Sequence, residues 1–544
     1  MRRSKIFRQT GPGLAVAAVL AGMGMPVANA AGLEGTWMGR DDFTWALSGY
    51  VRAWASMNLE DQPELSRVGK DSFGKLSMLR GSLLLDLDVK TGPVKWKAIG
   101  RLDREYKTNY LSDLEELRAD GTANAFGVNS NRDSRSITEN YNNGEIREFW
   151  AEVPIGERVT VKFGKQQLVW GESDFFQAMD LVHGYDYSWR LFFEGENEEW
   201  RKPLILLSTK IRIPEANGLI AAYIRPGWDR CEDIGNTYDI NGGRWFFQPY
   251  RGFDLSSGTS KNCEHKDGDQ DDVTGGIRWN GEAYGLNYSV AYLTTFAADP
   301  VASAGVVPGL FGAVAHQGVT NGEQLFQRIH PKIDVLGVTV SGYSETLDAV
   351  LSAEVAYTKD QPYNAGVGGF GEGNYITRGG GVCTAGLGLC EIVKKDTLRT
   401  MLRIDKDLNF QDLLGTSRPS FSSIQLFNTQ VLNYDGNEQL VRLFAYGTPL
   451  NEHNTILTLF TGLNYKNDTI NPGFAVGFDL SNGGGFAIPS VSVVFDDKWV
   501  AKAEADIFWD GGKSNRQQFS GGESQLFGYF SRASQLVLRV TRQF

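Results

Sequence analysis

The strongest constraint on the fold is a regular alternation of apolar and charged residues near the C-terminus. Within 499–509, every second residue from Trp499 to Trp509 is apolar, and charged residues stand between them at positions 502, 504 and 506. A repeat of two residues is that of a β-strand with one apolar and one polar face. The last ten residues, 535–544, repeat this pattern less strictly.

Such strands are expected to close into a barrel. Trp499 and Trp509 bracket the length of roughly 9–11 residues that a tilted strand needs to cross a bilayer. In hydrocarbon the free edge of an open sheet has no hydrogen-bond partners, and only closure supplies them. We therefore predict an all-β fold, a single transmembrane antiparallel β-barrel. The alternative is an edge strand of a large soluble sandwich.

The end of the chain carries a first resemblance. The final strand-like run stops at Phe544, and it resembles the C-terminal strands of bacterial outer-membrane barrels. The resemblance implies that the barrel assembly machinery recognises this end. It also implies the outer membrane, with its lipid and lipopolysaccharide, as the location.

Residues 1–30 resemble a secretory signal peptide, with a basic start, an apolar run at 14–25 and the small residues Ala28 and Ala30 at a cleavage site. We expect residues 31–544 to form one domain, the outer-membrane barrel. No later stretch offers the roughly 18 apolar residues of a membrane-spanning helix. The net charge of −11 argues against a nucleic-acid partner.

Short turns and long polar loops alternate along the chain, which predicts 16–18 strands with short periplasmic turns and long extracellular loops. The weakest strand is 424–432, because a long connection precedes it. The predicted strands are 43–58, 79–90, 94–103, 145–153, 159–168, 204–213, 219–225, 273–279, 284–296, 332–340, 347–358, 396–406, 424–432, 456–465, 470–480, 491–495, 499–509 and 524–544.

A barrel of this size is wide enough for a water-filled lumen, and charged residues at alternate strand positions are the candidates to line it. Both signs are present, so no strong ion selectivity follows. The alternative for each residue is a charge pair across neighbouring strands. The pore-lining candidates are Arg80, Asp86, Asp88, Glu148, Glu152, Lys162, Glu354, Arg399, Arg403, Asp405, Lys502, Glu504 and Asp506.

The connection after Leu168 differs from the other loops, because its apolar residues from Phe175 to Val182 recur at helical spacing. An apolar face here needs cover. We predict that residues 169–202 fold inward and narrow the pore; an extracellular cap packed on its own side chains is the alternative. The constriction-loop candidates are Trp170, Glu172, Phe175, Phe176 and Asp180.

This block also resembles a family of bacterial outer-membrane proteins, the domain-of-unknown-function family 1302 (DUF1302). The matching residues are Gly164-Lys165-Gln166, Trp170-Gly171-Glu172, Asp180, Arg201, Pro203 and Pro226, whereas His183-Gly184 stands where the family usually has Asn-Pro. The resemblance implies a large barrel, associated with an exported periplasmic partner protein and with inner-membrane exporters of hydrophobic or lipid-like molecules. It brings no catalytic residues.

The four cysteines lie in polar stretches of an expected exported chain, so disulfides are predicted. Three connectivities are possible, and we favour Cys231 with Cys263 and Cys383 with Cys390, because each pair falls inside one loop. The acidic run 267–272 departs from a calcium loop. Solvated acidic loops, bridged to lipopolysaccharide phosphates by divalent cations, are favoured instead. No metal site or cofactor is predicted.

The leading functional hypothesis is an outer-membrane channel for small amphiphilic or hydrophobic organic molecules, gated by the loop after Leu168. A second hypothesis makes the barrel a plugged docking or assembly partner for a periplasmic protein and an envelope exporter of lipids or hydrophobic molecules. A membrane-embedded hydrolase is a third possibility, but no serine stands in a Gly-x-Ser-x-Gly frame, so no enzyme is predicted.

Overall fold

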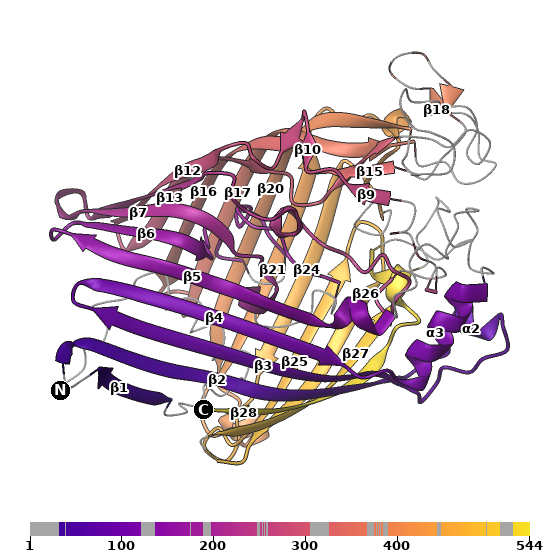
Figure 1. The fold of residues 1–544 in the computed structure, drawn as a ribbon, viewed down its shortest axis with the longest axis horizontal. Coiled ribbons are helices and arrows are strands. Elements are labelled where there is room, and N and C mark those ends of the chain that lie inside the picture. Colours follow the sequence, from indigo (N-terminus) through magenta and orange to yellow (C-terminus); the bar gives the residue numbers. More distant parts are fainter. Residues whose placement is uncertain are drawn as a thin grey trace.

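The computed structural model is a closed antiparallel β-barrel of 18 strands (Figure 1). The residues that the structure describes are 32–37, 40–120, 137–173, 176–188, 197–246, 251–252, 254, 256, 259–304, 326–366, 375–376, 378, 380, 382–383, 390–442, 448–496, 498–511 and 526–544. The predicted signal peptide, 1–30, lies outside them. All 18 predicted strands correspond to barrel strands, including the weak one at 424–432.

Each barrel strand pairs antiparallel with its neighbours around the ring. The barrel strands are β2 (Arg40–Asn58), β3 (Leu76–Thr91), β4 (Val94–Glu105), β5 (Asn143–Ile155), β6 (Val159–Gln166), β7 (Leu204–Ile213), β8 (Gly218–Arg225), β12 (Thr274–Ala283), β13 (Leu286–Phe296), β16 (Lys332–Ser344), β17 (Ala349–Ala365), β20 (Glu391–Leu408), β21 (Ser420–Val431), β24 (His453–Gly462), β25 (Ile470–Asp479), β26 (Gly485–Val494), β27 (Trp499–Trp509) and β28 (Gln535–Gln543).

Shorter elements extend the wall or lie in the loops. In Figure 1 the tight turns of the purple strands gather on the left, and α2 and α3 lie on the right. The remaining elements are β1 (Leu33–Trp37), α2 (Pro63–Ser66), α3 (Asn109–Asp120), η2 (Ile137–Tyr141), α4 (Asn197–Trp200), η3 (Pro214–Ala216), η4 (Cys231–Asp233), β9 (Thr259–Lys261), β10 (Glu264–His265), β11 (Gly268–Asp269), β14 (Val301–Ala304), β15 (Phe326–Ile329), β18 (Tyr375–Ile376), β19 (Val382–Cys383), α5 (Gln411–Leu414), η6 (Gly436–Glu438), β22 (Leu440–Arg442), β23 (Thr448–Pro449) and η7 (Leu526–Phe530).

The ring closes between β28 and β2. Their register runs from Gln535 opposite Asn58 to Gln543 opposite Tyr50. Phe544 then exchanges two backbone hydrogen bonds of 3.0 Å with Gly49. The two ends of the sheet are therefore joined by the last residues of the chain.

The wall has two chemically different faces. Leu402 is 57% exposed, whereas the adjacent Arg403 is 5% exposed, and Ile146 and Arg147 differ in the same way. Successive side chains of a strand point to opposite faces, so the apolar face is outside and the polar face is inside. Among the described residues, no helix is long and apolar enough to span a membrane.

Several predicted boundaries were wrong. Strand 491–495 begins earlier, at Gly485, and the last strand begins later, at Gln535, because η7 precedes it. β17 extends seven residues beyond Thr358, past an irregular step where Asp360 adopts a φ of 54°. The alternation of apolar and polar residues does not continue through that step, so the sequence pattern does not predict that β17 continues to Ala365.

The loops are tied down by a disulfide and by an interior core. Cys231 and Cys263 are bonded, as predicted. The Cys383 side chain lies outside the described residues. A large buried apolar cluster inside the barrel joins wall side chains to loop side chains, among them Trp54, Phe486, Val537, Tyr185, Trp245 and Phe527. Loop residues thus occupy part of the interior.

Candidate functional site

The connection between β6 and β7, which we call the inward segment (residues 167–202), lies against the inner face of the wall. Near its start, Trp170 is 2% exposed and packs edge-on against Tyr223 of β8 at 5.2 Å between ring centroids. Arg278 of β12 donates a 2.8 Å hydrogen bond to the Trp170 carbonyl. A Cβ on Gly276 would collide with the Trp170 ring, so the glycine makes room for it.

The middle of the inward segment is attached to β17 and β20. The carboxylate of Glu354 accepts hydrogen bonds from the backbone N–H groups of Glu172 and, at 3.0 Å, of Met179. Arg403 donates a 2.9 Å hydrogen bond to the Glu172 carbonyl. Glu172, Glu354 and Arg403 therefore lie together. The sequence pattern had assigned Glu172 to the constriction loop and the other two residues to the pore lining.

Aromatic packing continues the contact further round the barrel. Phe176 lies 5.5 Å from Phe427 of β21 and 6.3 Å from Phe527 of η7, measured between ring centroids. The backbone of 176–180 has no helical assignment despite the helical spacing of its apolar residues. Phe175, another constriction-loop candidate, lies outside the described residues. The apolar face is covered by wall and loop aromatics.

A buried ion pair clasps the two arms of the inward segment together. Asp180 lies 2.5 Å from Arg201 and accepts a 2.7 Å hydrogen bond from the Tyr185 hydroxyl. Burial opposes ionisation of Asp180, but Arg201 and Tyr185 outweigh it and hold the pKa of the carboxyl below its usual value. Asp180 is therefore a charged anchor rather than a pore-facing acid.

His183, where the chain departs from the usual family sequence, bridges the same two arms. Its Nε2 accepts a 2.9 Å hydrogen bond from the Leu168 N–H, and its Nδ1 lies 2.9 Å from the Lys202 carbonyl. Burial and the nearby Arg201 lower the pKa of His183 to about 4. The next residue must be small, because a Cβ on Gly184 would lie 2.1 Å from the Gly235 carbonyl oxygen.

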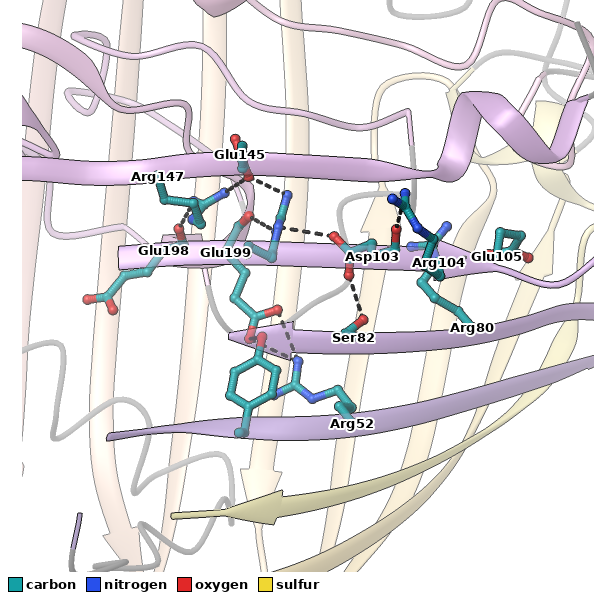
Figure 2. Close-up of polar contacts among 12 residues, drawn as sticks. Arg52, Arg80, Ser82, Asp103, Arg104, Glu105, Glu145, Arg147, Glu198 and Glu199 are labelled. Atoms are coloured by element: carbon teal, nitrogen blue, oxygen red, sulfur yellow. Dashed lines mark hydrogen bonds and ion pairs between the residues drawn. The ribbon is translucent and has the colours of Figure 1, made fainter. Parts of the chain in front are cut away.

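Three arginines of the wall, which we call the arginine clamp (Arg52, Arg101 and Arg147), hold the end of the inward segment (Figure 2). Arg52 of β2 forms hydrogen bonds of 2.9 and 3.0 Å with the Glu199 carboxylate. Arg101 of β4 donates to the Glu199 carbonyl at 2.9 Å.

Arg147 of β5 completes the clamp by donating to the carbonyls of Glu198 at 2.6 Å and of Arg201 at 2.9 Å. Arg101 and Arg147 also share Glu145, each at 2.9 Å; Arg147 and Glu145 are labelled in Figure 2. These guanidinium groups satisfy carbonyls at the end of α4 that have no partner within so short a helix. Sequence reasoning missed the clamp, although alternation places each arginine on the polar side of its strand.

Most of the other pore-lining candidates pair within the wall. Asp86 and Asp88 both contact Lys97 of the next strand, at 2.6 and 2.9 Å. All thirteen candidates lie on the polar face, and three of them, Glu148, Glu354 and Arg403, contact the inward segment. Their other partners include Glu105 for Arg80, Lys95 for Glu152, Trp150 for Lys162, Gln361 for Arg399, Glu504 for Lys502, Asp405 for Arg403 and Gln535 for Asp506.

Within the described residues, no group of three or more His, Cys, Asp or Glu side chains could hold a metal ion. The Asp267–Asp272 stretch instead forms local contacts, including a 3.5 Å ion pair between Asp272 and Lys332.

Comparisons with known proteins give a family and several solved structures of low sequence identity. No curated protein matches the chain. Similar solved structures include OpdK of Pseudomonas aeruginosa, at 9% identity and a TM-score of 0.42 over 93% of this chain and 99% of that one. They also include Acinetobacter baumannii OccAB2, at 8% and 0.43 over 92% and 98%, and the channel DcaP of the same species, at 9% and 0.37 over 94% and 100%.

The family assignment rests on sequence. The model of one family matches residues 11–518, and its description is "Protein of unknown function (DUF1302)". This match spans most of the chain, including the inward segment and the arginine clamp. The chain therefore belongs to the DUF1302 family.

Proposed function

We propose that the protein is a bacterial outer-membrane channel for small amphiphilic or hydrophobic organic molecules, closed at rest by the inward segment. The exposed apolar outer face supports insertion in a membrane, because a soluble protein rarely exposes so continuous an apolar surface. The polar inner face supports an aqueous path. The short turns would then face the periplasm and the long loops the exterior.

The observation that carries the proposal is the way in which the inward segment is held. It contacts wall strands at separate points around the ring, at β2, β8, β17 and β21. These contacts are made by side chains and carry no continuous sheet pairing. Attachments of this kind can be released without opening the wall, which is what a gate requires.

The proposed substrate class is supported by the side chains that hold the segment in place. Release of the segment would uncover Phe176 and its aromatic neighbours, which are packed together in the docked state, and the arginine clamp at the other end of the same segment. A molecule with an apolar body and a polar head would find a surface for each. The periplasmic and exporter partners remain predictions from the family resemblance.

The test compares the purified protein with a variant whose residues 169–200 are replaced by a Gly-Ser linker, both reconstituted in planar bilayers. We expect rare, small current steps from the first and a steady large current from the second. A variant with residues 121–136 replaced in the same way controls for loop shortening. Absence of current from the linker variant, with the barrel shown to be folded, would count against the proposal.

The extent of the interior apolar cluster favours a second candidate, a permanently plugged barrel that docks a periplasmic protein. Side chains from five loops and from η7 contribute to that cluster. In this case the linker variant would conduct no better than the natural chain, because other loops still fill the lumen. Capture of a defined periplasmic partner by the intact barrel, without flux, would support this alternative.

A further inference from the structure

The outer face of the barrel carries a groove over β3, β4 and β5. It has a volume of 370 Å³ and is lined by Leu83, Leu85, Gly100, Arg101, Leu102, Gly144, Glu145 and Ile146. An added Cβ on Gly100, or on Gly81 nearby, would meet nothing within 4 Å. Neither glycine has a positive φ, so the backbone does not require glycine at either position. Missing side chains therefore open the groove, next to a shift of register between β4 and β5 at Ile99 and Gly100.

The groove lies at the depth of hydrocarbon. Along the outward face of β4 the side chains run from Trp96, which is exposed, through Gly100 and Leu102 to Tyr106, which is also exposed. Exposed Trp and Tyr side chains mark the two interfaces of a membrane barrel. The groove therefore lies between the interfaces, about midway along the strand between Trp96 and Tyr106, and Tyr106 marks the end that carries α3 and the long loops.

A cation, Arg104, lies two residues beyond Leu102, between the groove and Tyr106. Arg104 has the same orientation as Leu102, is exposed, and lies opposite Gly81 in the register of β3 and β4. The Arg104 side chain donates a 3.4 Å hydrogen bond from Nη1 to the Asp103 carbonyl (Figure 2). Among the described residues it forms no other polar contact. No carboxylate of the described residues pairs with it. Its charge is available to an anion at the membrane surface.

We propose that this groove binds lipopolysaccharide, with an acyl chain of lipid A in the groove and a lipid A phosphate on Arg104. The apolar walls of the groove suit the acyl chain of an anionic amphiphile, and the unpaired guanidinium of Arg104 suits its anionic head group. The choice of lipopolysaccharide rests on the proposed orientation, in which the long-loop end meets the outer leaflet. Arg104 supplies a charge-assisted hydrogen bond that a phosphate accepts well.

The experiment measures lipid retention in detergent, which does not depend on conductance. The delipidated full-length barrel is titrated with a deep-rough lipopolysaccharide, and bound lipid is counted by native mass spectrometry. The test variants are Arg104→Gln, which removes the cation, and Gly100→Leu, which fills the groove. Arg212→Gln, at the short-turn end, and Val338→Leu, on the outer face of β16, are the matched controls.

We expect Arg104→Gln to weaken binding about fivefold, the effect of one cation at a membrane surface, and Gly100→Leu to weaken it to a similar extent. The controls should stay within about twofold of the natural chain. Equal binding by all variants, or tighter binding of phosphatidylglycerol than of lipopolysaccharide, would overturn the proposal.

A heat-modifiability gel shows whether each variant keeps a folded barrel, so loss of binding by unfolding is recognised. Conductance of the same variants in planar bilayers is measured separately. A channel that fails to conduct but retains Arg104-dependent binding would refute the proposed function and leave the lipid site standing.

Discussion

Arg52 and Glu199 are 147 positions apart in the sequence, yet the guanidinium of one and the carboxylate of the other form hydrogen bonds of 2.9 and 3.0 Å. The Tyr50 hydroxyl adds a third bond to the same carboxylate, at 3.0 Å. Both charged side chains are largely buried, at 5% and 11% exposure. The contact joins the first barrel strand to the end of the inward segment.

Replacing Glu199 by Gln should favour the open channel. The change removes the anion while Arg52 stays buried, and loss of a charged hydrogen bond costs on the order of 2 kcal/mol, or about thirtyfold in the closed–open equilibrium. Open probability in planar bilayers is the measurement. Glu215→Gln, in an exposed ion pair with Arg158, is the control and should leave gating unchanged. Equal gating in both variants would show that the clamp does not hold the segment.

Replacing Glu354 by Gln should loosen the middle of the inward segment. A carboxylate accepts from both N–H groups at once, whereas the amide offers one acceptor oxygen. The amides of Glu172 and Met179 should exchange with deuterium about tenfold faster, and the barrel strands should not change. Glu504→Gln, within the wall pair with Lys502, is the control. Unchanged exchange at Met179 would contradict the assignment.

Acidification should release the segment through His183. Its pKa falls from 6.5 to about 4 when it is buried in the docked segment, so docking is fully stable above about pH 6.5 and weakens as the pH falls towards 4. The total loss is on the order of 3 kcal/mol. Protonation of Nε2 also removes the acceptor that the Leu168 N–H uses.

The measurement is open probability from pH 7.5 to pH 4.5, for the natural chain and for His183→Gln. The natural channel should open more than the variant as the pH falls, and the difference between the two profiles is the contribution of His183. Asp180 does not interfere, because its contribution is lost only below about pH 4, where the carboxyl takes up a proton. A flat profile for the natural channel would rule out His183 as the titrating group.

Removing the Cys231–Cys263 disulfide should destabilise its loop but not the barrel. The bond joins residues 32 apart, for which chain entropy gives a stabilisation of about 3–4 kcal/mol. In the double variant to serine, limited proteolysis should cleave between residues 226 and 273 much faster. Gel heat-modifiability should be unchanged. Loss of the folded barrel would mean that the loop is required for assembly.

The sequence predicts the wall well because lipid and water impose a repeat of two residues on every strand. The run from Trp499 to Trp509 is found with the predicted bounds, and so is Leu204–Ile213. Prediction weakens where strands continue above the membrane, as in β17 beyond Thr358, because both faces there meet protein. The alternation of apolar and polar residues then no longer shows which side chains face outward and which face inward.

The site is less accessible to sequence reasoning than the wall. Alternation places Arg52 on the polar face, but nothing local indicates that its partner is Glu199, since ring closure decides which side chains meet. Asp180 and Arg201 belong to the family motif, yet their ion pair is visible only in three dimensions. The sequence signal identifies residue types and faces, whereas the pairing across the lumen comes from the closed shape.

The inward segment reaches Arg52, which lies on β2 opposite Thr541 at the seam where β28 completes the ring. The same segment also touches Phe427 on β21, far from that seam along the wall. Its contacts therefore span the wall from the seam to the far side of the ring. We expect biogenesis to complete the wall first, and the inward segment to dock after the final strand has joined the first.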